Sequence, residues 1–198
     1  RRKTQNQIHI FCNGEVAEPN YFQEIKDKLA IRNLIKIHHK DTKGLSPLQL
    51  IIKTINYKND NKDKFSNDDQ DQVWCVFDVY EYWKENKNEF KKAINKAFNN
   101  DINLAWSNES FELWFLLHFN QLTTPISRND YNKKLKDLFK KKFSADYKKN
   151  MNGVYNLLSD FQAEAIKNAK IIFKNNKIEK NPSTAVFLLI EEIFKNSK

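Results

Sequence analysis

The chain has 198 residues, a formal net charge of +9 and only two cysteines. Two cysteines are too few for a disulfide framework or a zinc site, which favours a reducing, cytoplasmic setting. The longest apolar runs contain about five residues, far short of the ~20 that a membrane-spanning helix needs. The excess of positive charge favours a polyanionic partner, nucleic acid first. We therefore expect a protein that contacts nucleic acid and no membrane.

Four short apolar segments in the first half of the chain predict strands, at residues 7–12, 34–39, 71–78 and 102–106. Segments with apolar residues at helical spacing lie between them, and Glu18-Pro19 and Ser46-Pro47 open two of these helices. Strands that alternate with helices predict parallel pairing with right-handed crossovers. We therefore expect an α/β fold over residues 7–107, with a mostly parallel four-stranded sheet flanked by helices.

From Ser107 onward the pattern becomes helical. Helices are predicted at 110–119, at 127–142 with Ser127 as the cap, at 153–175, and from Pro182 onward. Residues 108–198 are therefore expected to form a helical region packed on the sheet.

Two carboxylates follow predicted strands. Asp78 ends the most apolar strand, and Glu15 comes directly after Gly14 at the end of the first strand. Glycine at that place indicates a positive φ or a close approach to a ligand. Because ligands of open α/β sheets bind at the carboxyl ends of the strands, Glu15 and Asp78 are candidate ligands of Mg²⁺, which could activate water against a phosphoryl group. The alternative is that both acids are ordinary solvated loop residues.

Asn108 and Glu112 are further candidates near the end of the fourth strand. Residues four apart share a helix face, so both could line the site or position a water molecule. Alternatively, Glu112 caps a neighbouring backbone or pairs with a lysine. His118 lies in the same apolar segment and is interpreted as a packed histidine rather than a general base.

Basic residues occur in two places. His39, Lys40 and Lys43 follow the second strand, where they could contact phosphate. Lysines also crowd residues 133–149, with Lys140 and Lys141 near the middle and aromatic residues between them. This mixture can bind nucleic acid through phosphate contacts and stacking. The alternative is an amphipathic helix with solvated lysines.

Several segments together resemble the RloB-like proteins. The matching stretches are Phe11-Cys12-Asn13-Gly14-Glu15, Val76-Phe77-Asp78, Ser107-Asn108, residues 111–114 and 116–119, and more weakly Asn181-Pro182-Ser183-Thr184. The resemblance implies a Toprim-type fold, a link to restriction loci and phage defence, and a Mg²⁺ site like those of topoisomerases, primases and nucleases. It implies that Glu15 is the Toprim glutamate and Asp78 the first acid of an Asp-x-Asp pair.

The second acid of that pair is replaced by Tyr80. A phenol with a pKa of ~10 is a poor magnesium ligand. Glu81 follows directly and is a candidate to assist, and one ion held by Glu15 and Asp78 remains compatible with the pattern.

The sequence thus favours a Mg²⁺-dependent nuclease of anti-phage defence, with Mn²⁺ as a substitute ion, that cuts RNA (tRNA included) or DNA. Glu15 and Asp78 would hold the ion, with help from Glu81 or Glu112, and lysines would bind the substrate backbone. The competing interpretation is a non-catalytic module that binds nucleic acid or a companion defence protein through a degenerate Toprim site. A nucleotide-signal sensor is the third class, and self-association into a homo-oligomer is left open.

Overall fold

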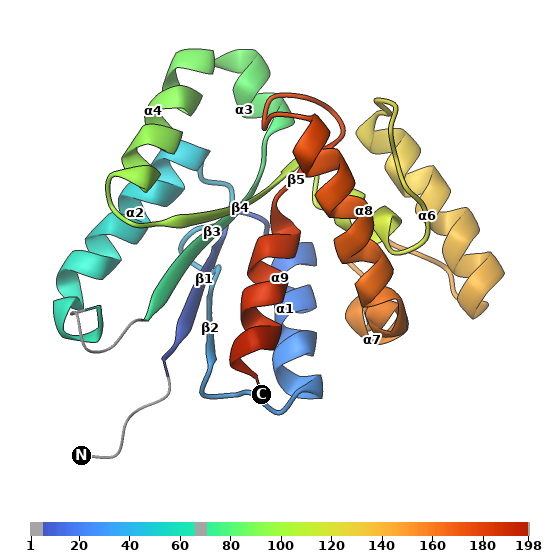
Figure 1. Cartoon of the computed structure of the whole chain (residues 1–198), viewed down its shortest axis with the longest axis horizontal. Coiled ribbons are helices and arrows are strands. Elements are labelled where there is room, and N and C mark those ends of the chain that lie inside the picture. The colour runs from blue at the N-terminus through green and yellow to red at the C-terminus, as the bar shows by residue number, and fades with distance from the viewer. Residues whose placement is uncertain (1–5, 66–70, 198) are drawn as a thin grey trace.

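The computed structural model describes residues 6–65 and 71–197, and this part of the chain forms a five-stranded sheet between helices (Figure 1). The strands are β1 (Ile8–Cys12), β2 (Ile35–His38), β3 (Gln72–Asp78), β4 (Asn103–Asn108) and β5 (Ser183–Thr184). The mixed α/β class and the mostly parallel sheet that the sequence predicts are confirmed.

The helices alternate with the strands up to β4 and dominate the chain beyond it. They are α1 (Ala17–Lys28), α2 (Pro47–Asp60), α3 (Tyr80–Glu85), α4 (Lys87–Phe98), α5 (Glu112–Leu117), α6 (Arg128–Phe143), α7 (Val154–Leu158), α8 (Gln162–Asn175) and α9 (Val186–Asn196), with short 3₁₀ turns at Lys62–Lys64 and Ser159–Phe161. In Figure 1, α2 and α4 lie on one side of the sheet, and α1 and α9 lie on the other, with α6, α7 and α8 farther out.

The strand order is β2-β1-β3-β4-β5. The first four strands are parallel, and the register pairs Phe11 with His38 and Cys12 with Val76. The chain goes from β1 to β2 on one side and then returns to β3 on the other. The neighbouring carboxyl ends of β1 and β3 therefore form a topological switch point, where open α/β sheets bind ligands.

The strand β3 is buried on both faces, as its unbroken apolar run predicts. Trp74 and Val76 pack in one hydrophobic cluster with α1, α5 and α9, whereas Cys75 and Phe77 pack in a second cluster with α2 and α4. Successive side chains of a strand point to opposite faces. The strand is thus fixed from both sides, and so is the position of Asp78 at its end.

The C-terminal region differs from the prediction because it supplies a fifth strand. β5 pairs antiparallel with β4, the Oγ atoms of Ser107 and Thr184 lie 2.9 Å apart, and the Ala185 N–H donates to the Trp106 carbonyl at 2.9 Å. The helix expected from Pro182 therefore begins only at Val186. A strand of two residues carries no periodicity, so sequence pattern alone could not reveal it.

The segment after β3 also differs from the prediction. A helix was expected from about residue 84 to 99, but the structure has two helices, and α3 begins at Tyr80. Asn86 separates them, and its side-chain oxygen accepts a hydrogen bond from the Glu89 N–H at 3.0 Å, which caps α4. Asn at an N-cap competes with helix continuation in this way.

Candidate functional site

The turn after β1 brings a glutamate into the site that the sequence analysis did not select. Glu18 is 5% exposed although it lies on the apolar face of α1 with Phe22 and Ile25. Its carboxylate lies beside Gly14, where a Cβ atom would collide with it. Of the two roles predicted for Gly14, a positive φ or a close approach to a ligand, the structure shows a close approach. The group that approaches Gly14 is the Glu18 side chain and not a ligand.

Glu15, the predicted metal ligand of this turn, lies at the surface. Its Oε1 atom is 3.0 Å from Nζ of Lys43, and the two side chains are 68% and 56% exposed. Lys43 thus contacts the site through Glu15. Such a solvated ion pair contributes little to stability.

Asp78 lies at the end of β3 and is paired with an arginine. Its Oδ2 atom accepts a hydrogen bond from Nη2 of Arg128 at 3.2 Å. Although 26% of the Asp78 side chain is exposed, Oδ1 is buried and has no hydrogen-bond partner among the described residues. Arg128 is the first residue of α6, whose start is fixed by a capping box of Ser127 and Asp130.

Glu112 is 2% exposed at the first position of α5. Its Oε2 atom accepts a hydrogen bond from Ser110 Oγ at 2.6 Å, while the buried Oε1 has no partner in the described part of the chain. Asn108 does not share a helix face with it, contrary to the prediction. Pairing with Ser183 extends β4 through Asn108, so α5 begins only four residues later, and the Asn108 amide donates to the Ile178 carbonyl at 3.2 Å.

These side chains surround one pocket of about 260 Å³, which we call the acidic pocket. Its walls carry the four carboxylates of Glu15, Glu18, Asp78 and Glu112 and the ammonium group of Lys149. The acidic pocket lies at the carboxyl ends of β1 and β3, where the strand order predicts a ligand site.

The carboxylates of the acidic pocket perturb one another. Burial, together with the charge of Glu112, raises the pKa of Glu18 to about 7, against the opposing effects of a backbone hydrogen bond, Lys149 and Arg128. Burial, followed by the charges of Glu18 and Glu112, also raises the pKa of Asp78 well above its ordinary value, with Arg128 and Lys149 again opposing. The pocket therefore holds more negative charge than its two cations compensate, and it favours protons or another cation.

The other predicted binding residues lie elsewhere. His39 and Lys40 line a second, larger pocket between β2 and α2. Lys140 and Lys141 are exposed in the last turn of α6, about 18 Å along the helix from Arg128 at 1.5 Å per residue. The structure therefore does not bring these four residues to the acidic pocket.

The residues that follow Asp78 begin α3 (Tyr80–Glu85). Tyr80 is 40% exposed at the start of α3, with Nζ of Lys84 at 5.7 Å from its ring centroid. The side chain of Glu81, a predicted catalytic residue, lies outside the described part of the structure.

The interpretation of His118 as a packed residue is confirmed. Its side chain is buried, and Nδ1 lies 2.9 Å from the carbonyl oxygen of Trp114. Burial lowers the pKa of His118 to about 4, so the imidazole is neutral at neutral pH.

Three residues were missed by the sequence analysis as site residues: Glu18 and Lys149, which line the acidic pocket, and Arg128, which pairs with Asp78. A usable signal existed for Glu18, because a glutamate at helical spacing with Phe22 and Ile25 stands on a face that should be apolar. Arg128 and Lys149 had no comparable signal, since both belong to a segment in which basic residues abound.

The carboxylates line the acidic pocket without converging on one point. Within residues 6–65 and 71–197, no group of three or more His, Cys, Asp and Glu side chains is close enough together to hold a metal ion. The donor set nevertheless fits magnesium chemically, because the carboxylates are hard oxygen ligands and both Asp78 and Glu112 have a buried oxygen without a partner. Among these same described residues, no helix has the length and apolar character to cross a bilayer.

Fold and pocket together define an α/β protein with a carboxylate-rich site at the switch point of its sheet. A comparison with protein families matches the model of the RloB-like proteins over residues 8–193. The chain therefore belongs to the RloB-like family. Neither the curated proteins nor the solved structures that were searched show a match.

Proposed function

We propose that the chain is a Mg²⁺-dependent nuclease whose active site is the acidic pocket. The single observation that supports this most is the gathering of Glu18, Asp78 and Glu112 beside Lys149 and Arg128. Acidic groups that raise one another's pKa in a cleft are a frequent mark of functional sites. The RloB-like membership adds the expectation of a Toprim-type site and of a role in anti-phage defence, and both remain part of the proposal.

In this proposal Asp78, Glu112 and Glu15 would hold the ion through their carboxylates. The ion, when bound, supplies a Lewis acid that polarises a phosphoryl oxygen and lowers the pKa of water. Arg128 and Lys149 hold the non-bridging oxygens of the scissile phosphate.

Glu18 acts as the general base. With a pKa of about 7 it is in part ionised at neutral pH, and a base poised near the working pH transfers protons most effectively. A carboxylate oxygen of Glu18 takes the proton of the attacking water as the new P–O bond forms. The bond to the leaving ribose or deoxyribose oxygen then breaks, and that oxygen is protonated from solvent.

The test is cleavage of labelled tRNA, single-stranded RNA and duplex DNA in Mg²⁺, in Mn²⁺ and in EDTA. Glu18→Gln and Asp78→Asn are expected to lower cleavage by roughly 100-fold or more, the usual size of such contributions. Asp137→Asn, which changes an exposed aspartate on α6, is the matched control and should cleave like the wild type. Cleavage that is equal in all four proteins, or that persists in EDTA, would contradict the proposal.

The variant Glu15→Gln tests which glutamate near the end of β1, Glu15 or Glu18, is the main functional residue. If Glu15 is a ligand as the family resemblance implies, this variant loses cleavage as strongly as Asp78→Asn. If the buried Glu18 is the main functional glutamate, Glu15→Gln loses less than about tenfold, because a solvated side chain contributes little.

A second candidate function, nucleic-acid binding without cleavage, is favoured by the ion pair between Arg128 and Asp78. In that case the arginine, rather than a metal, is the permanent partner of Asp78. Wild-type protein would then bind nucleic acid in a salt-sensitive way, without cleavage, and equally in Mg²⁺ and EDTA. A companion defence protein or a second copy of the chain would be sought next.

A further inference from the structure

A second pocket lies outside the acidic pocket and shares no lining residue with it. It occupies about 770 Å³ between β2, the loop that follows β2, and α2. We call it the β2–α2 pocket. Its volume falls within the roughly 300–1,000 Å³ of typical small-molecule sites.

One wall of the β2–α2 pocket is a stack of flat rings. The imidazole of His38 lies parallel to the Phe11 ring, with centroids 4.2 Å apart and an interplanar angle of 5°. Tyr57 from α2 lies 4.8 Å from the His38 ring and is tilted by 60° to it, so it stands beside the stacked pair. Flat aromatic surfaces of this kind attract other planar rings by stacking.

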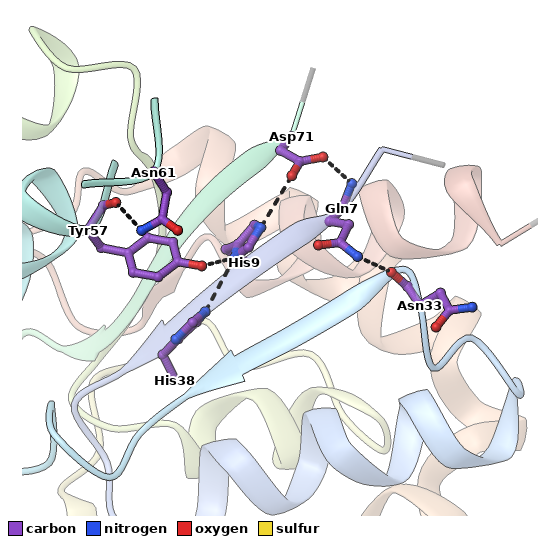
Figure 2. Close-up of polar contacts among 7 residues, drawn as sticks. All are labelled: Gln7, His9, Asn33, His38, Tyr57, Asn61 and Asp71. Atoms are coloured by element: carbon purple, nitrogen blue, oxygen red, sulfur yellow. Dashed lines mark hydrogen bonds and ion pairs between the residues drawn. The ribbon is translucent and has the colours of Figure 1, made fainter. Parts of the chain in front are cut away.

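A buried polar network holds these rings in place (Figure 2). His9 is 1% exposed, and its Nδ1 lies 3.3 Å from Nε2 of His38 and 3.2 Å from the Tyr57 hydroxyl. Its Nε2 lies 3.4 Å from Oδ2 of Asp71. Because the rings are oriented before any ligand arrives, binding loses little conformational entropy.

The remaining walls combine apolar and amide groups. Ile37, Leu45 and Ile52 supply apolar surface, and Ile52 is a large hydrophobic residue that remains 40% exposed. The Asn56 side chain on α2 also lines the pocket. A carboxamide presents a donor and an acceptor side by side, which matches the N6 and N7 atoms of adenine.

The charges at the pocket compensate one another. Lys40 and Lys53 stand against Asp41 and Asp60, and Nζ of Lys53 donates to the Asp41 carbonyl at 2.7 Å. This rim has no excess of positive charge for a phosphate. The ligand should therefore be recognised through its ring.

We propose that the β2–α2 pocket binds a planar nitrogen heteroaromatic ring, specifically a purine base that stacks on His38, contacts Tyr57 and forms hydrogen bonds with Asn56. The base comes either from a free nucleoside or nucleotide or from an unpaired position of a single strand. This proposal does not depend on cleavage at the acidic pocket.

Isothermal titration calorimetry with adenosine, AMP and single-stranded oligoadenylate tests the proposal. Ile52→Trp fills the mouth of the pocket, and Leu188→Trp is its matched control, because Leu188 on α9 is 38% exposed. Ile52→Trp is expected to weaken base binding at least about tenfold, comparable to the loss of one stacked base. Leu188→Trp should bind like the wild type, and adenosine and AMP should bind within about threefold of each other because the rim is neutral.

A second pair of variants probes the amide. Asn56→Leu should abolish the preference for adenosine over uridine, whereas Asn95→Leu on the exposed face of α4 should preserve it. Binding of the free nucleoside that Ile52→Trp weakens supports a free ligand. If only the oligonucleotide binds, and Ile52→Trp weakens this binding, the natural ligand is an unpaired base of a single strand. If none of the three probes binds, or if both tryptophan variants bind like the wild type, the proposal is overturned.

Discussion

The two ends of β3 carry aspartates in opposite situations. Asp71, just before the strand, accepts hydrogen bonds from the Gln7 N–H at 2.6 Å and from His9 with Oδ2, so both of its oxygens have partners. Asp78, at the other end, has one oxygen paired with Arg128 and one buried oxygen with no partner among the described residues. Complete pairing of a buried polar group supports stability, whereas incomplete pairing leaves capacity for a ligand at an energetic cost.

The largest expected effect is a dependence of folding stability on pH, which arises at the end of β3 that carries Asp78. Glu18 has an ordinary pKa of 4.5 and a folded-state pKa of about 7. Between these pH values the folded chain binds more protons than the unfolded chain. The contribution of Glu18 to the free energy of unfolding is therefore fully present below about pH 4.5 and is lost as the pH rises through about 7. The raised pKa of Asp78 acts in the same direction.

The predicted loss from Glu18 alone is about 2.5 kcal/mol between pH 5 and 8, at 1.36 kcal/mol per pKa unit. Urea unfolding at pH 5 and pH 8 in EDTA measures it, with Glu18→Gln as the variant whose stability should vary less with pH. If the stabilities of wild type and Glu18→Gln run parallel across this range, the repulsion in the acidic pocket is not as described.

The next effect concerns the completely paired end. Asp71→Asn removes the charge that holds His9 and weakens the bonds to Gln7 and His9. We expect about 2 kcal/mol of destabilisation, the usual size for a broken bond to a charged buried group, and no change in cleavage per folded molecule. Equilibrium unfolding beside a cleavage assay checks this. A stability equal to the wild type, or a loss of cleavage, would show that the two aspartates are not distinct in the way we describe.

The smallest expected effect comes from a comparison of two helix caps, one beside each pocket. Ser127 and Ser46 each form a capping box, at α6 beside Arg128 and at α2 in the wall of the β2–α2 pocket. Replacing either serine with alanine should cost about 1 kcal/mol and lower Tm by roughly 3 °C for a chain of this size.

Only Ser127→Ala should also steepen the fall of stability with rising pH, because it loosens the arginine that partly neutralises Asp78. Thermal unfolding of both variants at several pH values makes the comparison. Equal pH profiles in Ser127→Ala and Ser46→Ala would mean that the start of α6 does not control Asp78.

The four parallel strands of the sheet were predictable because their signal is local and strong. The run from Val73 to Phe77 is apolar without interruption, and such a run predicts a strand buried on both faces, which the structure confirms. Ser46-Pro47 predicts a helix start, and α2 begins there with its capping box. In both cases one short segment contains all the information that decides its conformation.

The acidic pocket was less predictable because it depends on distant pairings. The position of Asp78 followed from its strand, but its partner Arg128 lies 50 residues farther along the chain. Asn108 was expected to share a face with Glu112, but it pairs in β4 with Ser183 of β5, 75 residues away in sequence, and no local pattern reports such a pairing. Glu18 was overlooked as a functional residue because a glutamate before proline is also an ordinary helix start.

The pairing of β5 with β4 has a consequence for how the chain is made. Ribosomes deliver the sheet strands β1 to β4 first, whereas Arg128, Lys149 and β5 emerge later, and β4 keeps an open edge until residue 184 arrives. Contacts between residues so far apart form late and slow the folding of a domain. A growing chain therefore exposes the acids of β3 and α1 before the cations that face them exist, and the surroundings of the pocket are complete only after residue 184 has been added.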